Sequence, residues 1–270
     1  MTALRRKLEN LKAILKGIGS AALAFSGGCD SSFLTYVSRD VLRDRLLCVT
    51  MVGPFFPRAE KQAAGRIARD LGLRHVFLKE TLPENIKNNP RRRCYFCKKN
   101  LFTILKAYAK EKGFPAVIDA TNADDAGDFR PGMAALRELN VRSPLLEAGF
   151  SKKDIRLLSR RMGLSWWDKP SQACLASRFP YGEEFSEKKL RMVENAEEFI
   201  RGQGIRQVRV RYHDTVARIE TEKNELARLL MKSAAICAAL RAAGFHYVCV
   251  DLEGYRTGAM NETLAWKKKK

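Results

Sequence analysis

The protein has 270 residues, and its 50 lysine and arginine residues against 30 aspartate and glutamate residues give a formal net charge of +20. A hydrophobic content of 46% excludes a disordered or collagen-like chain, and no apolar run reaches the ~20 residues of a membrane span. The charge excess favours a polyanionic partner, either a nucleic acid or a small phosphorylated ligand.

The first part of the sequence alternates apolar strands with amphipathic helices. Leucines at three- and four-residue steps predict a helix over residues 2–17. The predicted strands are 21–26, 46–53, 75–80 and 116–122. The later predicted helices are 31–42, 97–113, 131–139 and 151–163, and residues 54–73 are predicted to form a turn followed by a helix. Apolar strands without polar alternation are typical of a parallel sheet with helices on both faces, so this order predicts a doubly wound α/β fold.

The pattern changes near Pro170. A predicted helix at 186–201 is followed by two alternating stretches that meet at His213 and Asp214, which indicates a hairpin. A helix at 223–243 and a strand at 247–254 complete the order. We therefore expect a doubly wound parallel sheet in a domain of residues 1–168 and a second, smaller α+β domain of residues 169–270.

A glycine-rich loop, SGGCDSS, lies between the first predicted strand and the next helix. Its two glycines allow close approach of a ligand, and the serine hydroxyls and helix N–H groups are suited to phosphate oxygens. An aspartate at this place is suited to a phosphate-bound Mg²⁺. A plain glycine turn is the alternative. The predicted phosphate-binding residues are Ser26, Gly27, Gly28, Asp30, Ser31 and Ser32.

Three of the seven cysteines are candidate metal ligands. Cys94 and Cys97 form a CxxC pair among basic residues, and Cys174 lies far along the chain in QACLASRFPYG. Two cysteines and a distant third are suited to a [4Fe–4S] cluster with one open iron. A redox dithiol with an unrelated Cys174, or three cysteines without a joint role, are the alternatives. The N-terminus lacks a signal-peptide core, so we expect a cytoplasmic protein with reduced thiols.

The loop resembles the PP-loop of the N-type ATP pyrophosphatases, which have an adenine nucleotide alpha-hydrolase-like fold. Over residues 20–264 the sequence resembles the LarE family, the sulfur transferases that make the nickel-pincer nucleotide of lactate racemase. The segments that carry this resemblance are AFSGGCDSSFL, RCYFCKKNLF, DATNADDAGDFRPG, SRFPYG, VRVRYHDTVARIE and DLEGYRTGAMNETL. The resemblance implies that ATP is cleaved between its α- and β-phosphates to activate a substrate by adenylation.

For this family the implied substrate is pyridinium-3,5-biscarboxylic acid mononucleotide, one carboxylate of which becomes a thiocarboxylate. Some members give up the sulfur of their own cysteine, whereas others hold a [4Fe–4S] cluster that carries an additional sulfide. Cys94, Cys97 and Cys174 make this sequence similar to the cluster type, and sacrificial use of the Cys174 sulfur is the alternative. The resemblance thus implies ATP, Mg²⁺, a [4Fe–4S] cluster, sulfide or another sulfur donor, and a homo-oligomer.

Further residues follow from matching motifs. Ser26, Gly27, Gly28, Asp30 and Ser31 would hold the ATP β- and γ-phosphates with Mg²⁺. Lys98, directly after the CxxC pair, is expected to neutralise developing negative charge, with a plain surface lysine as the alternative. Asn122, Asp125 and Asp128 follow the fourth predicted strand, where α/β proteins bind ligands. They are candidates for metal or ribose contacts, and capping of a helix N-terminus is the alternative.

Three arginines are candidates for the phosphate of the substrate mononucleotide: Arg178, Arg209 and Arg211. Arg209 and Arg211 alternate on one predicted strand, so both side chains are expected on the same face, where they can grip a phosphate. A solvated strand face is the alternative.

A competing hypothesis is a tRNA-thiolating PP-loop enzyme, which the charge of +20 favours. Such an enzyme needs a broad basic face and usually an added RNA-binding or zinc module, and the sequence indicates neither. We therefore expect a small-molecule substrate, with neither a nucleic-acid nor a membrane partner. A nucleotide-binding regulatory protein would need no CxxC pair, and an amidotransferase-type synthetase would use ammonia rather than sulfur.

Overall fold

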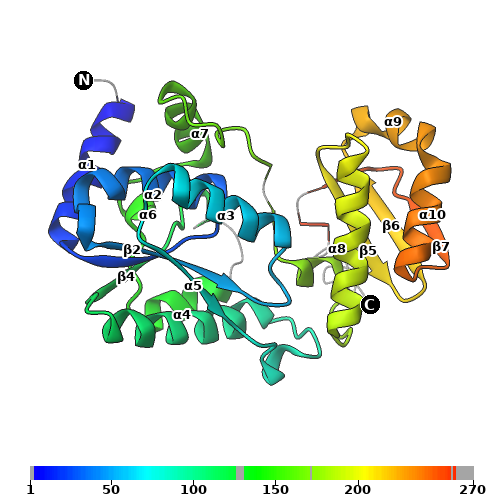
Figure 1. Ribbon diagram of the computed structural model, residues 1–270, viewed down its shortest axis with the longest axis horizontal. Helices are drawn as coiled ribbons and strands as arrows, with labels where there is room; N and C mark the ends of the chain where they lie inside the picture. Colours follow the sequence, from blue (N-terminus) through cyan, green and yellow to red (C-terminus); the bar gives the residue numbers. More distant parts are fainter. Residues whose placement is uncertain (1–2, 126–130, 171, 257, 260–270) are drawn as a thin grey trace, which may run out of the picture. The chain divides into compact units, whose positions relative to one another are not determined.

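The computed structural model describes residues 3–125, 131–170, 172–256 and 258–259 (Figure 1). The chain divides into two compact units, the first made of residues 1–86 and 91–172 and the second of residues 87–90 and 173–270. The short segment 87–90 thus belongs with the later part of the chain. The expected domain boundary between residues 168 and 169 stays a prediction.

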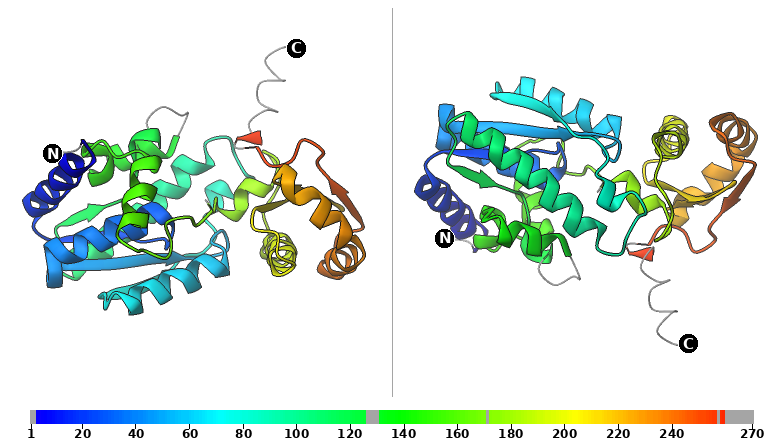
Figure 2. Two further views of the ribbon diagram at one scale, coloured as in Figure 1. Left: turned by 90° about the horizontal axis from the view of Figure 1, so that it is seen from above. Right: turned by 90° about the horizontal axis from the view of Figure 1, so that it is seen from below.

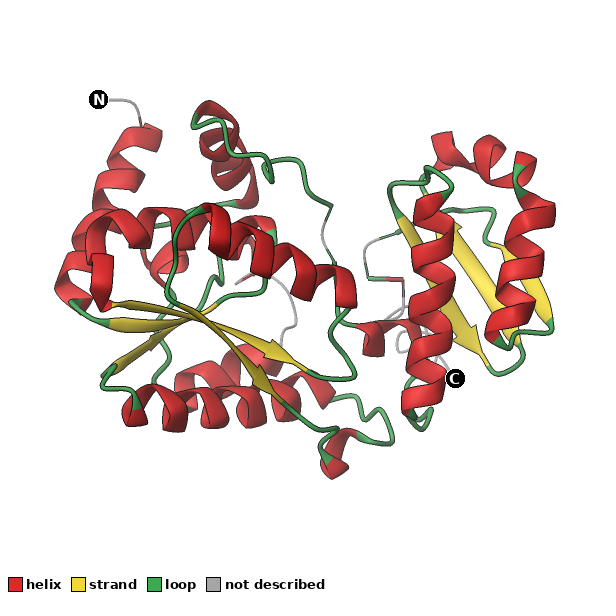
Figure 3. Ribbon diagram, in the orientation of Figure 1, coloured by secondary structure: helices red, strands yellow, loops and turns green. Residues whose placement is uncertain are grey.

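The first unit contains a four-stranded sheet in the order β3-β2-β1-β4, and every pair of neighbouring strands is parallel (Figure 3). The expected α/β fold with a parallel sheet is therefore confirmed. Its elements are α1 (Ala3–Ile18), β1 (Ala21–Ala24), α2 (Cys29–Leu42), β2 (Leu46–Val52), α3 (Arg58–Asp70), β3 (His75–Lys79), α4 (Arg93–Glu111), β4 (Ala116–Ile118), α5 (Pro131–Glu138), α6 (Pro144–Glu147) and α7 (Lys152–Arg161).

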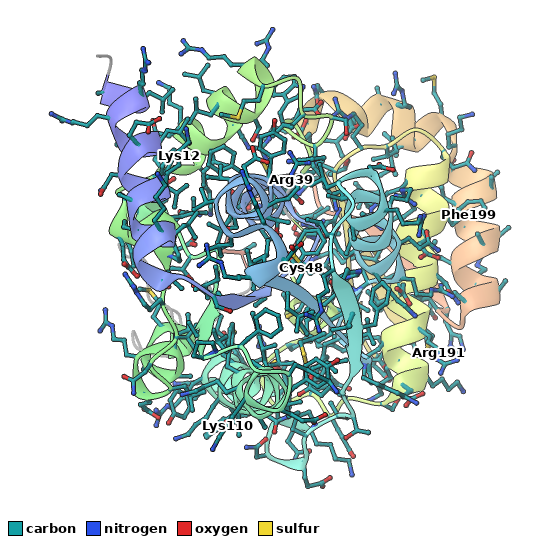
Figure 4. All side chains as sticks on the ribbon, turned by 60° about the vertical axis from the view of Figure 1, so that its left-hand side comes forward. Lys12, Arg39, Cys48, Lys110, Arg191 and Phe199 are labelled. Carbon is teal, nitrogen blue, oxygen red and sulfur yellow. The ribbon has the colours of Figure 1, made fainter. Side chains whose placement is uncertain are left out.

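Both faces of this sheet are buried under helices. Leu23 and Cys48 belong to a core shared with α1, α2 and α3, whereas their neighbours Ala22 and Leu47 belong to a core shared with α4 and α5. The right-hand view of Figure 2 shows α4 across the second face, and Figure 4 labels Cys48 in the interior. Alternate residues of one strand thus enter two cores, which explains why the strands carry no polar alternation.

The fourth strand is shorter than the predicted 116–122. β4 ends at Ile118 because Asp119 turns the chain: its carboxylate accepts hydrogen bonds from the Thr121 backbone N–H (3.2 Å) and hydroxyl (2.5 Å). Such local side-chain bonds compete with strand pairing. The segment after β4 is therefore a polar turn at the carboxyl end of the sheet.

The second unit contains a three-stranded sheet in the order β5-β6-β7. The predicted hairpin is confirmed, since His213 pairs with Val216 and the two strands are antiparallel, whereas β6 and β7 are parallel. The predicted helix 223–243 is wrong in one respect, because it is broken into two α-helices at Lys232. Its elements are α8 (Glu187–Gly202), β5 (Val208–His213), β6 (Val216–Thr221), α9 (Leu226–Met231), α10 (Ser233–Ala243) and β7 (Tyr247–Val250).

Among the described residues, no helix combines the length and the apolar character needed to cross a bilayer.

Candidate functional site

The glycine loop joins β1 to α2 at the carboxyl edge of the parallel sheet. Gly27 has φ +73°, and a Cβ atom built on it would lie 2.7 Å from the backbone nitrogen of Ala64 in α3. Gly28 is extended (φ −76°, ψ 167°) and precedes the first residue of α2. Only glycine meets both demands at position 27, so the loop passes close to α3 and directs the first N–H groups of α2 toward the edge of the sheet.

Two serine hydroxyls shape this loop. The Ser31 hydroxyl donates to the Gly28 carbonyl (3.2 Å) and accepts from the Ser26 backbone N–H (3.3 Å). The Ser26 hydroxyl accepts from the Gly28 backbone N–H (3.3 Å) and lies 3.0 Å from that of Ser31. Ser32 is fully buried, and within the described part of the chain its hydroxyl has no hydrogen-bond partner. Its role in phosphate binding stays a prediction.

Asp30 lies beside residues that follow β4. The Asn122 side-chain amide donates to an Asp30 carboxylate oxygen (2.9 Å), and the Asn122 backbone N–H donates to Asp125 (3.2 Å). The Lys152 ammonium lies 3.3 Å from the other Asp125 carboxylate oxygen. The structure therefore brings Asp30, Asn122 and Asp125 together at the ends of neighbouring strands β1 and β4, where parallel sheets bind ligands. Asp128 lies outside the described residues.

Burial raises the pKa of the Asp30 carboxyl, and the nearby Asp125 carboxylate acts in the same direction, while Lys152 opposes both. A second cation near Asp30 would favour its charged form. The carboxylates of Asp30 and Asp125 are oxygen ligands of the kind that Mg²⁺ prefers, so the residues present are suited to the metal. Burial also raises the pKa of the neighbouring Cys29 thiol to about 11, which keeps it protonated at neutral pH.

Lys98 lies on α4 with its ammonium 3.7 Å from a carboxylate oxygen of Asp119. Asp119 also accepts a hydrogen bond from the Ser143 hydroxyl (2.6 Å). Sequence reasoning missed Asp119 and Lys152. The turn after β4 gave a signal for Asp119, because a buried strand that ends in Asp-Ala-Thr-Asn leads its polar side chains to the ligand edge.

All seven cysteines lie in the described residues and are thiols rather than disulfides. Cys94 is exposed and Cys97 half-buried near the start of α4, and their three-residue spacing puts them on one helix face. Cys174 is half-buried and belongs to the second unit. Within the described ranges, no group of three or more His, Cys, Asp or Glu side chains is arranged to hold a metal ion. The three-cysteine cluster site stays a prediction.

Arg178 is 1% exposed, so its guanidinium contacts other groups of the protein rather than solvent. It donates to both carboxylate oxygens of Glu197 on α8 (2.7 and 2.9 Å). Its Nη1 group donates to the backbone carbonyls of Ala173 (2.7 Å) and Cys174 (3.1 Å) and to the Ser177 hydroxyl (2.9 Å). The guanidinium therefore fixes the backbone around Cys174, and its expected contact with a substrate phosphate stays a prediction.

The two strand arginines are also buried. Arg211 makes a two-point contact with Glu220 on β6 (2.9 and 2.7 Å) and donates to the Ser177 carbonyl (2.7 Å). Burial lowers the pKa of Arg209 to about 10, and the positive charge of Arg178 acts in the same direction. Arg209 and Arg211 alternate on β5 as expected, and both are buried. They therefore belong to a solvent-excluded cluster rather than to a solvated strand face. Binding of a substrate phosphate by Arg209 and Arg211 stays a prediction.

Glu197 on α8 is the carboxylate that pairs with the buried Arg178 guanidinium. Burial opposes its charged form, but the Arg178 guanidinium prevails and lowers the pKa of Glu197 below its usual range. Arg201 and the Val210 backbone N–H also donate to it. Its position in a helix rich in charged residues did not single it out, because two of its partners, Arg178 and Val210, lie on other segments of the second unit, whereas Arg201 lies on α8 itself.

The chain is similar to known proteins along nearly its whole length. It is 36% identical over 267 residues to a pyridinium-3,5-bisthiocarboxylic acid mononucleotide synthase of Lactiplantibacillus plantarum, covering 98% of this chain and 97% of that protein. It is 40% identical over 265 residues to an uncharacterized protein of Synechocystis sp., covering 97% and 99%. A third relative, an uncharacterized protein of Methanocaldococcus jannaschii, is 32% identical over 254 residues, covering 94% of each chain. No protein-family model matches the chain.

Proposed function

The chain belongs to the LarE family of sulfur transferases, and we propose that it uses ATP to convert a carboxylate of pyridinium-3,5-biscarboxylic acid mononucleotide into a thiocarboxylate. The observation that carries this function is 36% identity over 98% of the chain to a synthase of the bisthiocarboxylic product. The glycine loop at the carboxyl edge of a parallel sheet supports the ATP-dependent step.

The proposed reaction has two chemical steps, adenylation of the carboxylate and transfer of sulfur to it. A substrate carboxylate oxygen attacks the α-phosphorus of ATP, the bond to the β-phosphate breaks, and pyrophosphate leaves. Sulfide, as HS⁻, then attacks the activated carbonyl carbon, AMP leaves with the former carboxylate oxygen, and the proton of HS⁻ is released to give the thiocarboxylate. Adenylation is needed because an unactivated carboxylate has no good leaving group.

We assign the first step to the glycine loop and its neighbours. The N–H groups at the start of α2, with Ser26, Ser31 and the two glycines, would hold the β- and γ-phosphates. Asp30, with Asn122 and Asp125 beside it, would hold Mg²⁺ on those phosphates. Lys98 beside Asp119 would compensate negative charge at the same edge. The short serine network keeps the loop in place before the nucleotide arrives.

For the second step we propose that Cys94, Cys97 and Cys174 hold a [4Fe–4S] cluster. When bound, such a cluster supplies sulfide on its open iron. The CxxC pair on one face of α4 supports this choice, since it presents two thiols together among basic residues that favour thiolates. The Arg178 contacts to the Cys174 backbone would hold the third ligand in place.

Separate Cys94→Ala, Cys97→Ala and Cys174→Ala variants, reconstituted without oxygen, test the cluster. We expect each variant to lose the iron and acid-labile sulfide that the unmodified protein takes up, whereas Cys237→Ala keeps them. Full iron incorporation in all three variants would contradict the assignment. Intact mass after turnover then separates the two sulfur sources, because a sacrificial Cys174 leaves the protein lighter by one H₂S.

Arg209 and Arg211, with Arg178, are our candidates for the substrate phosphate. Glu197 and Glu220 hold two of these guanidiniums in fixed orientations, so little side-chain entropy is lost when an anion binds. An Arg211→Lys variant should raise the KM for the mononucleotide while the KM for ATP stays unchanged. Equal changes in both constants would show a general structural effect.

A further inference from the structure

A second segment of the first unit lies against the glycine loop. The Lys169 ammonium donates to the Gly27 backbone carbonyl (2.8 Å) and lies 2.9 Å from a carboxylate oxygen of Glu60 in the first turn of α3. The two side chains are 22% and 14% exposed, so this ion pair is largely removed from solvent. Lys169 follows Gly27 by 142 residues, which is why no local motif revealed it.

The backbone that carries this lysine is fixed in its own right. Arg156 on α7 donates from Nη1 to the Trp167 carbonyl (3.1 Å) and from Nη2 to the Lys169 carbonyl (2.8 Å). The Cys29 thiol, inside the glycine loop, also contacts the Trp167 carbonyl (3.7 Å). Residues 167–169 are therefore tied both to α7 and to the loop, and the ammonium has a defined position.

The charge of this ammonium acts on the loop. Both Arg156 and Lys169 act electrostatically on the Cys29 thiol, one residue after the second glycine. An ammonium group has three N–H donors, and in the described residues its contacts are with Gly27 and Glu60. A further donor is thus left for an anion that binds beside the glycine loop, next to the Gly27 carbonyl.

We propose that Lys169 binds the β- and γ-phosphates of ATP, and the pyrophosphate formed from them, as the side-chain cation of the glycine loop. This assignment deepens the proposed function and rests on its use of ATP. When no phosphate is bound, the Glu60 carboxylate holds the Lys169 ammonium. When a phosphate binds, the negative charge of Glu60 repels it. Removing the two charges should therefore change pyrophosphate affinity in opposite directions.

Titration calorimetry with magnesium pyrophosphate, ATP and AMP tests this proposal. For Lys169→Met we expect the Kd for pyrophosphate and ATP to rise by about 10- to 100-fold, the loss typical of one charge-assisted contact. The Kd for AMP should stay unchanged, because AMP has neither of the phosphates concerned. Lys153→Met, which removes an exposed lysine of α7, is the matched control and should bind all three ligands as the unmodified protein does.

Glu60→Gln supplies the second variant. Glutamine can still accept a hydrogen bond from the Lys169 ammonium but has no negative charge, so pyrophosphate should bind more tightly. A purely structural role for the Lys169–Glu60 pair predicts weaker binding in both variants, with AMP and ATP affected equally, and that result would overturn the proposal. Unchanged ATP binding in Lys169→Met would overturn it as well.

The proposal and the proposed function fail in different ways. If the unmodified protein introduces sulfur into the pyridinium mononucleotide while Lys169→Met binds pyrophosphate normally, only the role of Lys169 is wrong. If Lys169→Met loses pyrophosphate selectively but the unmodified protein thiolates no mononucleotide, the role of Lys169 stands and the proposed substrate is wrong.

Discussion

The glycine loop of the first unit and the arginine–glutamate cluster of the second are both candidate anion sites, yet they are built in opposite ways. The loop relies on backbone N–H groups, small side chains and one positive φ at Gly27. The cluster relies on full charges, Arg178 with Glu197 and Arg211 with Glu220, which are buried and paired. A backbone site is thus sensitive to added atoms, whereas a charged cluster is sensitive to lost charges.

The largest effect on stability is expected in the cluster. Glu197→Ala leaves the buried Arg178 guanidinium without its counter-charge, and breaking such a buried pair costs about 3–5 kcal/mol of unfolding free energy. Urea denaturation measures this loss. On the same helix, Glu187→Ala removes an exposed partner of Arg191 and should cost only about 0.3–0.5 kcal/mol. Equal costs for the two variants would contradict the view that the cluster depends on buried charge.

In the glycine loop, the addition of a single methyl group is expected to disturb the backbone and to lower activity. Gly27→Ala adds a Cβ at a positive φ and 2.7 Å from the Ala64 backbone, which costs about 1–2 kcal/mol for the backbone conformation alone. Displacement of the loop should lower substrate-dependent pyrophosphate release by at least about 100-fold, as expected when reacting groups are misplaced by ~1 Å.

The control for this substitution is Gly17→Ala, since nothing lies within 4 Å of a Cβ there. Gly17 is inside α1, so alanine should stabilise the helix by about 0.5–1 kcal/mol and leave pyrophosphate release unchanged. A Gly27→Ala variant with normal pyrophosphate release would show that the loop tolerates a side chain and does not hold the phosphates.

The two sites are also expected to differ in how stability changes with pH, and this effect is smaller. Burial raises the pKa of Asp30, so its contribution to stability is fully present below the unfolded-state pKa and is lost as pH rises through the raised folded-state pKa. Asparagine does not titrate. Asp30→Asn should therefore raise the melting temperature at about pH 7 more than at about pH 3, while Mg²⁺-dependent ATP binding weakens.

Glu197 has the opposite sign. Its pKa is lowered by Arg178, so its contribution is present above the unfolded-state pKa and is lost as pH falls. Glu197→Gln should lower the melting temperature more at neutral than at acidic pH. If the two variants, Asp30→Asn and Glu197→Gln, change stability in the same direction with pH, the contrast between the two sites is wrong.

The two sites also differ in how far the sequence could predict them. The loop was predictable because SGGCDSS is local and its place after a buried strand fixes its geometry. The pairing of Arg178 with Glu197, and of Lys169 with the Gly27 carbonyl, depends on contacts 19 and 142 residues apart that no periodicity encodes. The parallel sheet followed from strand composition, but the early end of β4 depended on the side chain of Asp119.

The mass of the product tests most directly whether this chain transfers sulfur to a pyridinium mononucleotide. Protein reconstituted without oxygen is incubated with the biscarboxylic mononucleotide, ATP, Mg²⁺ and sulfide. We expect a product in which one carboxylate oxygen is replaced by sulfur, formed together with AMP and pyrophosphate and absent without ATP. Unchanged substrate mass, with sulfur found instead in added tRNA, would contradict the claim.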